Sequence, residues 1–197
     1  MFAEDPARIP VHVRDVSYRS FLRPDGLWDI EGTLHDSKTY AQESLARGLL
    51  PAGAPIHHMC IRLTIDEAFT VQAVEADMPA TPFDACLPAA APLQLLVGVK
   101  IGAGWRKAIA ARMGKDKGCT HLRELLSGMG TAAFQTVGRY RAHQRRQAGL
   151  PEPVMLKPRP PLGESIFDLF DDISRRSEVV AALGCRKGIQ KLADLLP

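Results

Sequence analysis

The sequence lacks the motifs that mark the commonest enzyme and metal-binding classes. It has no glycine-rich phosphate loop, no serine elbow, no zinc helix with two histidines and no paired Cys-x-x-Cys string. These absences argue against the commonest nucleotide-binding, hydrolase and zinc-ribbon classes. Because no cofactor fingerprint is present either, we expect the protein to act without a bound cofactor.

Strong charge and long apolar runs are also absent. The net charge of +3, from 25 basic and 22 acidic residues, is too small and too dispersed to indicate a nucleic-acid partner. No apolar run approaches the roughly 20 residues that span a bilayer, and residues 1–10 lack the apolar core of a signal peptide. We therefore expect a cytoplasmic protein that binds neither nucleic acid nor membrane.

The length and composition fit one domain with an appendage. The chain has 197 residues, of which 46% are hydrophobic and 24% charged, as in ordinary globular proteins. Residues 151–161 include five prolines and predict an extended segment. We expect an α+β domain over residues 1–150, a proline-rich linker over 151–162 and a helical arm over 163–197.

The helical arm has an apolar stripe that needs a surface to cover. The stripe consists of Ile166, Phe167, Leu169, Phe170, Ile173, Val179, Val180 and Leu183. It could pack on its own domain or on a second subunit. Because symmetric pairs are the commonest assembly and the linker is long, we expect a homodimer formed through this arm.

The first half of the domain has the pattern of an antiparallel β-meander. Four segments have the composition and alternation of strands: 11–22, 27–34, 56–66 and 69–76. Turn residues at 23–26 join the first two, and a short helix is expected over 39–48. The alternation within the third strand places His57 on the apolar face and Arg62 on the other.

The second half of the domain has the pattern of helices. We expect helices over 86–98 and 105–113, and a third that begins near Thr120 with that residue as its N-cap. Trp105 is expected to be a packing residue. Strands that come first and helices that come later indicate an α+β fold, in which the helices pack on the sheet.

Cys119 and His121 flank the expected helix start and are candidates for chemistry. Backbone amides and the helix dipole favour a thiolate and a neutral imidazole there, which suits a nucleophile, an acid–base pair or metal ligands. Alternatively, Cys119 is a small buried residue and His121 only a donor at the helix start. His57, on an apolar strand face, is either a satisfied core histidine or points into a pocket.

Three further charged residues are candidates on or near the strands. Asp36 and Lys38 lie close together and could tune each other for proton transfer, although most such charges form surface pairs that contribute little. Arg62 could bind an anion or belong to a solvated sheet face. Since His57 and Arg62 are expected on opposite faces, only one of these faces can hold the pocket.

Three strings of residues occur in order along the chain: DIEGTLHDSK at 29–38, HHMCIRLTID at 57–66 and GCTHLRELL at 118–126. Together they resemble a bacterial family known as domain of unknown function 2889 (DUF2889), over about residues 14–136. The family has no established general activity, so the resemblance implies a fold and a site region but no reaction. It strengthens the functional interpretation of Cys119 and His121.

A weaker likeness is to the iron–sulfur cluster scaffold proteins, in which strands also precede helices. Ligands in those proteins come from a strand, a loop and a helix start. The corresponding residues here are His57 or Cys60, then Cys86, then Cys119 with His121. This chain lacks the glycine-flanked cysteines of such scaffolds, so the likeness concerns architecture alone.

The leading hypothesis is a small-molecule enzyme of the lyase or isomerase type. His57, His121 and Cys119 would carry out acid–base chemistry on an aromatic or carbonyl compound. The metal-binding or iron–sulfur carrier alternative takes its ligands from Cys86, Cys119, His121 and either His57 or Cys60. A third hypothesis is a non-catalytic interaction module that docks on a partner through the C-terminal arm.

The cysteines are expected to be free thiols. The four of them, at positions 60, 86, 119 and 185, are widely scattered in a chain without a visible export signal. Titration of the denatured, unreduced protein with a thiol reagent should therefore detect four thiols per chain. Two or fewer would show that a structural disulfide is present.

Overall fold

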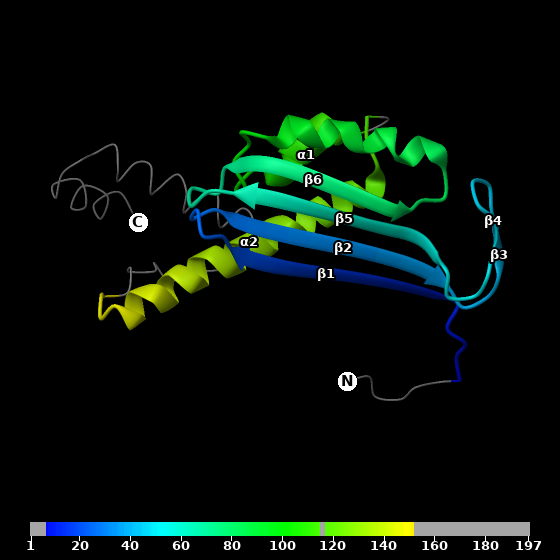
Figure 1. The fold of residues 1–197 in the computed structure, drawn as a ribbon, viewed down its shortest axis with the longest axis horizontal. Helices are drawn as coiled ribbons and strands as arrows, with labels where there is room; N and C mark the ends of the chain where they lie inside the picture. Colours follow the sequence, from blue (N-terminus) through cyan, green and yellow to red (C-terminus); the bar gives the residue numbers. More distant parts are fainter. Residues whose placement is uncertain (1–6, 115–116, 152–197) are drawn as a thin grey trace, which may run out of the picture.

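The computed structural model describes residues 7–114 and 117–151 of the chain (Figure 1). The first half forms one antiparallel sheet, whose strands lie in the order β1 (His12–Leu22), β2 (Trp28–Lys38), β5 (Pro55–Ile65) and β6 (Val71–Ala80). Helices from the second half cover one face of this sheet. The expected α+β fold is therefore confirmed, while the proposed C-terminal arm, 163–197, lies outside the described residues.

The two faces of the sheet follow from the alternation of apolar and polar residues along its strands. On β2, Trp28, Ile30 and Leu34 are at most 3% exposed and belong to the core. Their counterparts on β5 are Met59, Ile61, Leu63 and Ile65. The chain reverses between β1 and β2 at Gly26, which has a φ of +85° that glycine adopts readily.

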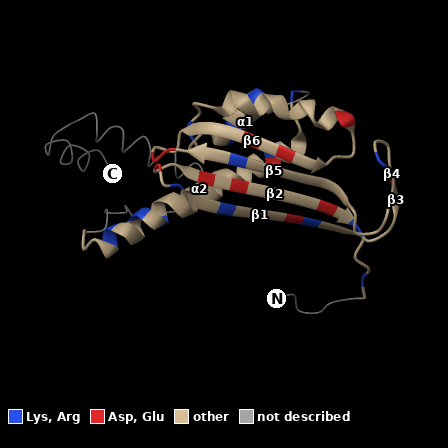
Figure 2. Cartoon of the chain, in the orientation of Figure 1, with Lys and Arg blue, Asp and Glu red and all other residues tan. Residues whose placement is uncertain are grey.

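The helical layer consists of two short 3₁₀ helices and two α-helices: η1 (Asp84–Cys86), η2 (Pro88–Leu96), α1 (Trp105–Met113) and α2 (Thr120–Gln147). In Figure 1, α2 passes behind the sheet and extends past β1. Its last turn carries Arg145 and Arg146 (Figure 2), where positive charge interacts favourably with the helix dipole. None of the described helices is both long and apolar enough to cross a membrane.

The expected helix over 39–48 is wrong. This segment contributes to a small two-stranded sheet formed by β3 (Gln42–Ser44) and β4 (Gly48–Leu50). Leu45 is 91% exposed and Leu49 is 68% exposed, so the segment offers the core no continuous apolar face. A helix this short is not stable in water without such packing.

The segment 86–98 is largely helical, as expected, but it does not form an α-helix. Most of the segment forms the 3₁₀ helix η2, which begins at Pro88 and contains Pro92. Proline has no N–H and its ring clashes with a preceding carbonyl group, so an α-helix is disfavoured here. The segment still packs into the core through Leu93 and Leu96, which are buried.

A buried tryptophan joins the two α-helices. Trp105, at the start of α1, is 1% exposed and donates from Nε1 to the carbonyl oxygen of Leu126 in α2, at 2.9 Å. Gly130 allows this contact, because a Cβ atom at that position would lie 2.7 Å from Cδ1 of Trp105. The expected packing role of Trp105 is therefore confirmed.

Gly130→Ala should lower the free energy of unfolding by about 1–3 kcal/mol, because the new methyl group must displace the Trp105 ring and strain its hydrogen bond. Denaturant unfolding followed by tryptophan fluorescence measures this change. Gly138→Ala is the matched control in the same helix, since nothing lies within 4 Å of its Cβ position. That variant should be stabilised by up to about 1 kcal/mol through higher helix propensity, and equal effects of the two substitutions would contradict the packing account.

Candidate functional site

A buried carboxylate, Asp36, lies at the centre of the candidate site. It is 1% exposed, and the strand register places it between Arg14 on β1 and His57 on β5. Arg14 donates from Nε to Oδ1 and from Nη2 to Oδ2, each at 2.7 Å. Nε2 of His12, also on β1, lies 3.1 Å from Oδ1. Both carboxylate oxygens are thus engaged by side chains from the neighbouring strand.

These contacts keep Asp36 ionised. Burial raises the pKa of the carboxyl group because it disfavours the charge, but the hydrogen bonds and positive charge of Arg14 outweigh burial. With smaller contributions from His12 and His57, the pKa falls to about 2. Arg14 also donates from Nη1 to Glu124 on α2 at 3.3 Å, so the same guanidinium group joins the sheet to the helix.

His57 approaches Asp36 from the other side. Its Nδ1 lies 3.0 Å from Oδ2 of Asp36, yet this buried nitrogen has no well-formed hydrogen bond to any described residue. Burial lowers the pKa of His57, and the nearby His121 lowers it further, while Asp36 offsets only part of the effect. The imidazole of His57 is therefore neutral near pH 7.

Cys119 and His121 form a second pair at the start of α2. Cys119, rather than the expected Thr120, is the N-cap, because the backbone is still extended at this residue. Its Sγ lies 3.9 Å from Nδ1 of His121. Burial raises the pKa of the thiol, but hydrogen bonds from His121 and from the backbone N–H of Leu122 outweigh burial and lower it. In return, the contact with Cys119 raises the pKa of His121 against the opposing effect of burial.

The two pairs meet through their imidazole rings. The ring centroids of His57 and His121 are 4.0 Å apart, with an angle of 41° between the ring planes. The leading hypothesis from the sequence requires these two histidines to lie close together, and they do. Their pKa values move in opposite directions, that of His57 downward and that of His121 upward. Neighbouring groups whose pKa values are pushed apart can supply a base and an acid to one reaction.

One group of side chains in the described part of the chain has the spacing of a metal site. It consists of Asp36, His57 and His121, whose potential ligand atoms lie within 4.8 Å of one another. Cys60, Cys86 and Cys119, three of the ligands considered from the sequence, are not in this group. Cys60 points to the opposite sheet face, where its Sγ is 3.7 Å from Oγ1 of Thr33.

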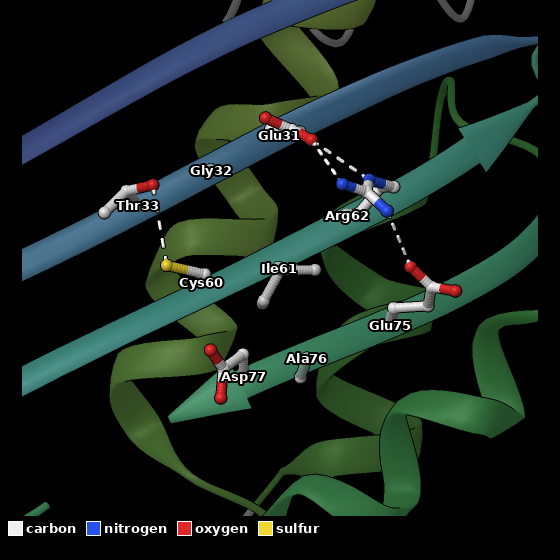
Figure 3. Close-up of a pocket in the computed structure, with 9 residues that line it drawn as sticks. All are labelled: Glu31, Gly32, Thr33, Cys60, Ile61, Arg62, Glu75, Ala76 and Asp77. Atoms are coloured by element: carbon white, nitrogen blue, oxygen red, sulfur yellow. Dashed lines mark hydrogen bonds and ion pairs between the residues drawn. The ribbon is translucent and has the colours of Figure 1, made fainter. Parts of the chain in front are cut away.

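Arg62 also lies on that opposite face. Figure 3 shows it between Glu31 and Glu75, to which its guanidinium nitrogens donate at 2.8 Å and 3.0 Å respectively. The pocket around it has a volume of about 450 Å³ and includes Cys60 and Asp77. Because two carboxylates already compensate the charge of Arg62, this side chain is a poor anion site and takes no part in the histidine cluster.

The structure therefore brings some of the residues proposed from the sequence into one site and places others elsewhere. Four of them come together at the seam between sheet and helix: Asp36, His57, Cys119 and His121. Arg62 lies on the other face. Lys38 ends β2 two residues beyond Asp36, but the ion pairs of Asp36 are formed with other side chains.

Sequence reasoning missed three residues that support the site: His12, Arg14 and Glu124. The signal for Arg14 lies in the register of β1 against β2. Arg14 is opposite Asp36, and both belong to the set of alternate residues that faces α2. Since a shift of one residue would reverse the faces, this partnership depends on a register that the pattern of β1 alone does not specify.

The chain is an α+β protein in which helices cover one face of an antiparallel sheet. A cysteine, two histidines and a buried carboxylate lie at the seam between sheet and helix and form a candidate acid–base site. The sequence model of one family, described as "Protein of unknown function (DUF2889)", matches residues 12–135. The chain belongs to this family. The match extends from the start of β1 into α2 and contains the whole of the described site.

No curated protein and no solved structure matches the chain significantly. The weaker likeness to iron–sulfur cluster scaffold proteins is not supported. Cys60 and Cys119, two of the ligand positions considered for such a cluster, lie on opposite sides of the sheet.

Asp36→Asn should lower the free energy of unfolding at pH 7 by about 2 kcal/mol. The pKa of Asp36 is lowered from 3.8 to about 2, so its ionisation stabilises the fold fully above about pH 4, and this stabilisation is lost as the pH falls toward 2. Urea unfolding at pH 7, 4 and 2.5 measures the effect. The stability of the wild-type protein should fall more steeply between pH 4 and 2.5 than that of the variant.

Asp25→Asn is the control for this prediction. Asp25 pairs with Arg23 at 2.6 Å, but both side chains are exposed, so solvent screens the pair. This variant should retain the stability and acid sensitivity of the wild-type protein. Identical pH dependence of the wild-type protein and the Asp36 variant would contradict the central role of Asp36.

Proposed function

We propose that the protein is a small-molecule enzyme in which His57 and His121 carry out acid–base chemistry beside the thiol of Cys119. The proposal depends on one observation: the two rings are 4.0 Å apart and their pKa values are displaced in opposite directions. A neutral His57 can accept a proton while a protonated His121 donates one. The sites of proton removal and proton donation are thus adjacent.

Asp36 and Arg14 act as positioning residues for the base. Nδ1 of His57 faces Asp36, so Nε2 is the nitrogen left to accept a proton from a substrate. Once His57 is protonated, the adjacent carboxylate stabilises the imidazolium ion that has formed. Arg14 holds this carboxylate through two hydrogen bonds of 2.7 Å, which fixes its position relative to the ring.

Cys119 raises the pKa of His121, the proposed general acid. Its Sγ lies 3.9 Å from Nδ1 of His121, and this contact lowers the pKa of the thiol and raises the pKa of the imidazole. The pair lies at the N-terminus of α2, where the helix dipole and free backbone amides favour a thiolate. His121 can therefore remain protonated next to a neutral His57.

This pair suits a lyase or isomerase that acts on a carbonyl compound, including an aromatic one. His57 removes a proton from the carbon next to the carbonyl group, and His121 protonates the carbonyl oxygen, which gives an enol. In an isomerisation, His57 returns its proton to another position as His121 recovers its own. In an elimination, His121 takes its proton back from the enol oxygen, the electron pair of the enol expels a group from the next carbon, and this group leaves with the proton of His57. Neither route needs an oxidant or a cofactor.

A metal centre on Asp36, His57 and His121 is less well supported than acid–base chemistry. Both oxygens of Asp36 already accept hydrogen bonds from Arg14. A divalent cation would have to displace this guanidinium group or lie beside its positive charge, which costs electrostatic energy. The same contacts favour a carboxylate that orients His57.

Proton exchange in D₂O tests the proposal, with phenylpyruvate and acetophenone as the probes. The full-length protein should accelerate exchange of the protons next to the carbonyl group of at least one probe, measured by ¹H NMR. His57→Gln and His121→Gln should each slow this exchange by about 100-fold or more, because removal of a general acid or base typically has such an effect.

His58→Gln is the matched control, because His58 neighbours His57 on β5 but shares the opposite face with Cys60. This variant should exchange the probe protons at the wild-type rate. Failure of the wild-type protein to accelerate exchange of either ketone over buffer would contradict the proposal. An equal loss in the His58 variant would do so as well, since it would place the activity elsewhere.

A further inference from the structure

The outer edge of the sheet is formed by β1, a strand of 11 residues that pairs only with β2 among the described residues. Its side chains remain largely uncovered, although several are apolar. Val13, Val16 and Phe21 are 40%, 44% and 46% exposed. Tyr18 and Leu22 are 37% and 42% exposed. An apolar edge strand of this length offers a row of free backbone N–H and C=O groups beside an apolar surface.

Monomeric proteins usually protect such an edge, and β1 lacks several of the common forms of protection. It contains no proline and no lysine, and its register against β2 is continuous, without a bulge. Of its three charged residues, Arg14 faces α2 and pairs with Asp36, while Asp15 and Arg19 lie four positions apart on the opposite face of the strand. Charges in the middle of an edge strand either repel a partner or match complementary charges on it.

We propose that β1 pairs antiparallel with β1 of a second copy of this chain, centred on Ser17. In this register Asp15 lies opposite Arg19 of the other copy, and two-fold symmetry produces this pair twice. Val13 then lies opposite Phe21, and Val16 opposite Tyr18. At these positions the sequence of β1 is complementary to itself in charge and in hydrophobicity about Ser17, while Arg14 lies opposite Ser20 and keeps its own partner, Asp36.

The faces of the two sheets also match in this arrangement. Residues of β1 with even numbers face α2, as the contacts of Arg14 with Glu124 and of Ser20 with Thr136 show. Pairing about Ser17 joins even positions to even and odd to odd, so both copies carry their helices on the same side. The result is one continuous sheet of eight strands with a single helical layer.

A groove between β1 and α2 lies close to the proposed two-fold axis. Its volume is about 540 Å³. The small residues Gly128, Thr131 and Ala132 of α2 line one wall, and Tyr18 of β1 lines the other. The pairing brings the same groove of the second copy next to it. Small residues allow the two α2 helices, which extend past β1, to approach each other closely.

This interface differs from the homodimer expected through residues 163–197, and it is independent of the proposed chemistry. It is nevertheless adjacent to the site, because β1 also carries the Arg14 that holds Asp36. Dimerisation would fix the strand on which this contact depends.

A charge swap in the full-length protein tests the pairing. Sedimentation velocity should give twice the chain mass of 21.5 kDa for the wild-type protein. Asp15→Arg places an arginine opposite Arg19 of the other copy at both symmetric positions. The dissociation constant of the dimer should rise about tenfold or more. The double variant Asp15→Arg/Arg19→Asp restores both opposite-charge pairs and should recover the wild-type dissociation constant. Circular dichroism of each variant checks that the fold is retained.

Disulfide trapping provides an independent measurement. Ser17→Cys places two thiols opposite each other across the axis, where antiparallel Cα atoms lie about 4.5–5.5 Å apart, within reach of a disulfide. Mild oxidation should therefore give a covalent dimer. Val13→Cys is the control, since its two copies would lie eight positions, or roughly 27 Å, apart and should stay uncrosslinked.

Three results would overturn the proposed pairing. The first is a wild-type protein that stays at 21.5 kDa, which would indicate that another segment of the chain covers the edge in the monomer. The second is a dimer that does not respond to Asp15→Arg or is not restored by the double variant. The third is crosslinking through position 13 but not through position 17.

Discussion

The structure depends on one electrostatic constraint, which is the burial of an ionised carboxylate at Asp36. A buried charge is costly unless it is paired and hydrogen-bonded. Arg14 meets this requirement with two short hydrogen bonds from β1, and its third nitrogen contact reaches Glu124 on α2. The register of the sheet and the position of α2 are therefore tied to one carboxyl group. The same carboxylate lies 3.0 Å from Nδ1 of His57, so this buried charge also faces a candidate base.

A second constraint acts at the start of α2. The N-terminus of a helix favours negative charge, and Cys119 occupies the N-cap with His121 beside it. His121 and the backbone amides lower the pKa of the thiol, and the contact with Cys119 raises the pKa of His121. Burial and the nearby His121 lower the pKa of His57. The pKa values of two identical side chains are thus displaced in opposite directions, because one contacts the sulfur of Cys119 and the other is buried beside a second imidazole. On the opposite sheet face, the charge of Arg62 is instead compensated by two carboxylates, Glu31 and Glu75.

The sequence predicted those features that depend on periodicity and failed where register or packing decides. Alternation in 56–66 was enough to place His57 on the covered face, and helical spacing after Thr120 was enough to bring Cys119 and His121 to a helix start. The contact of Arg14 with Asp36 depends on strand pairing across 22 positions, which no local pattern contains. The segment 39–48 was misassigned because its apolar residues found no core to pack against.

The central claim is that the pKa values of His57 and His121 are displaced in opposite directions, the first by burial and the second by its contact with Cys119. Titration of the histidine Cε1 protons by NMR in the full-length protein, assigned with His57→Gln and His121→Gln, measures both pKa values directly. The account predicts that His57 titrates below the ordinary histidine value of about 6.5 and His121 above it. Two histidines that titrate together near the ordinary value, or in the reverse order, would contradict it.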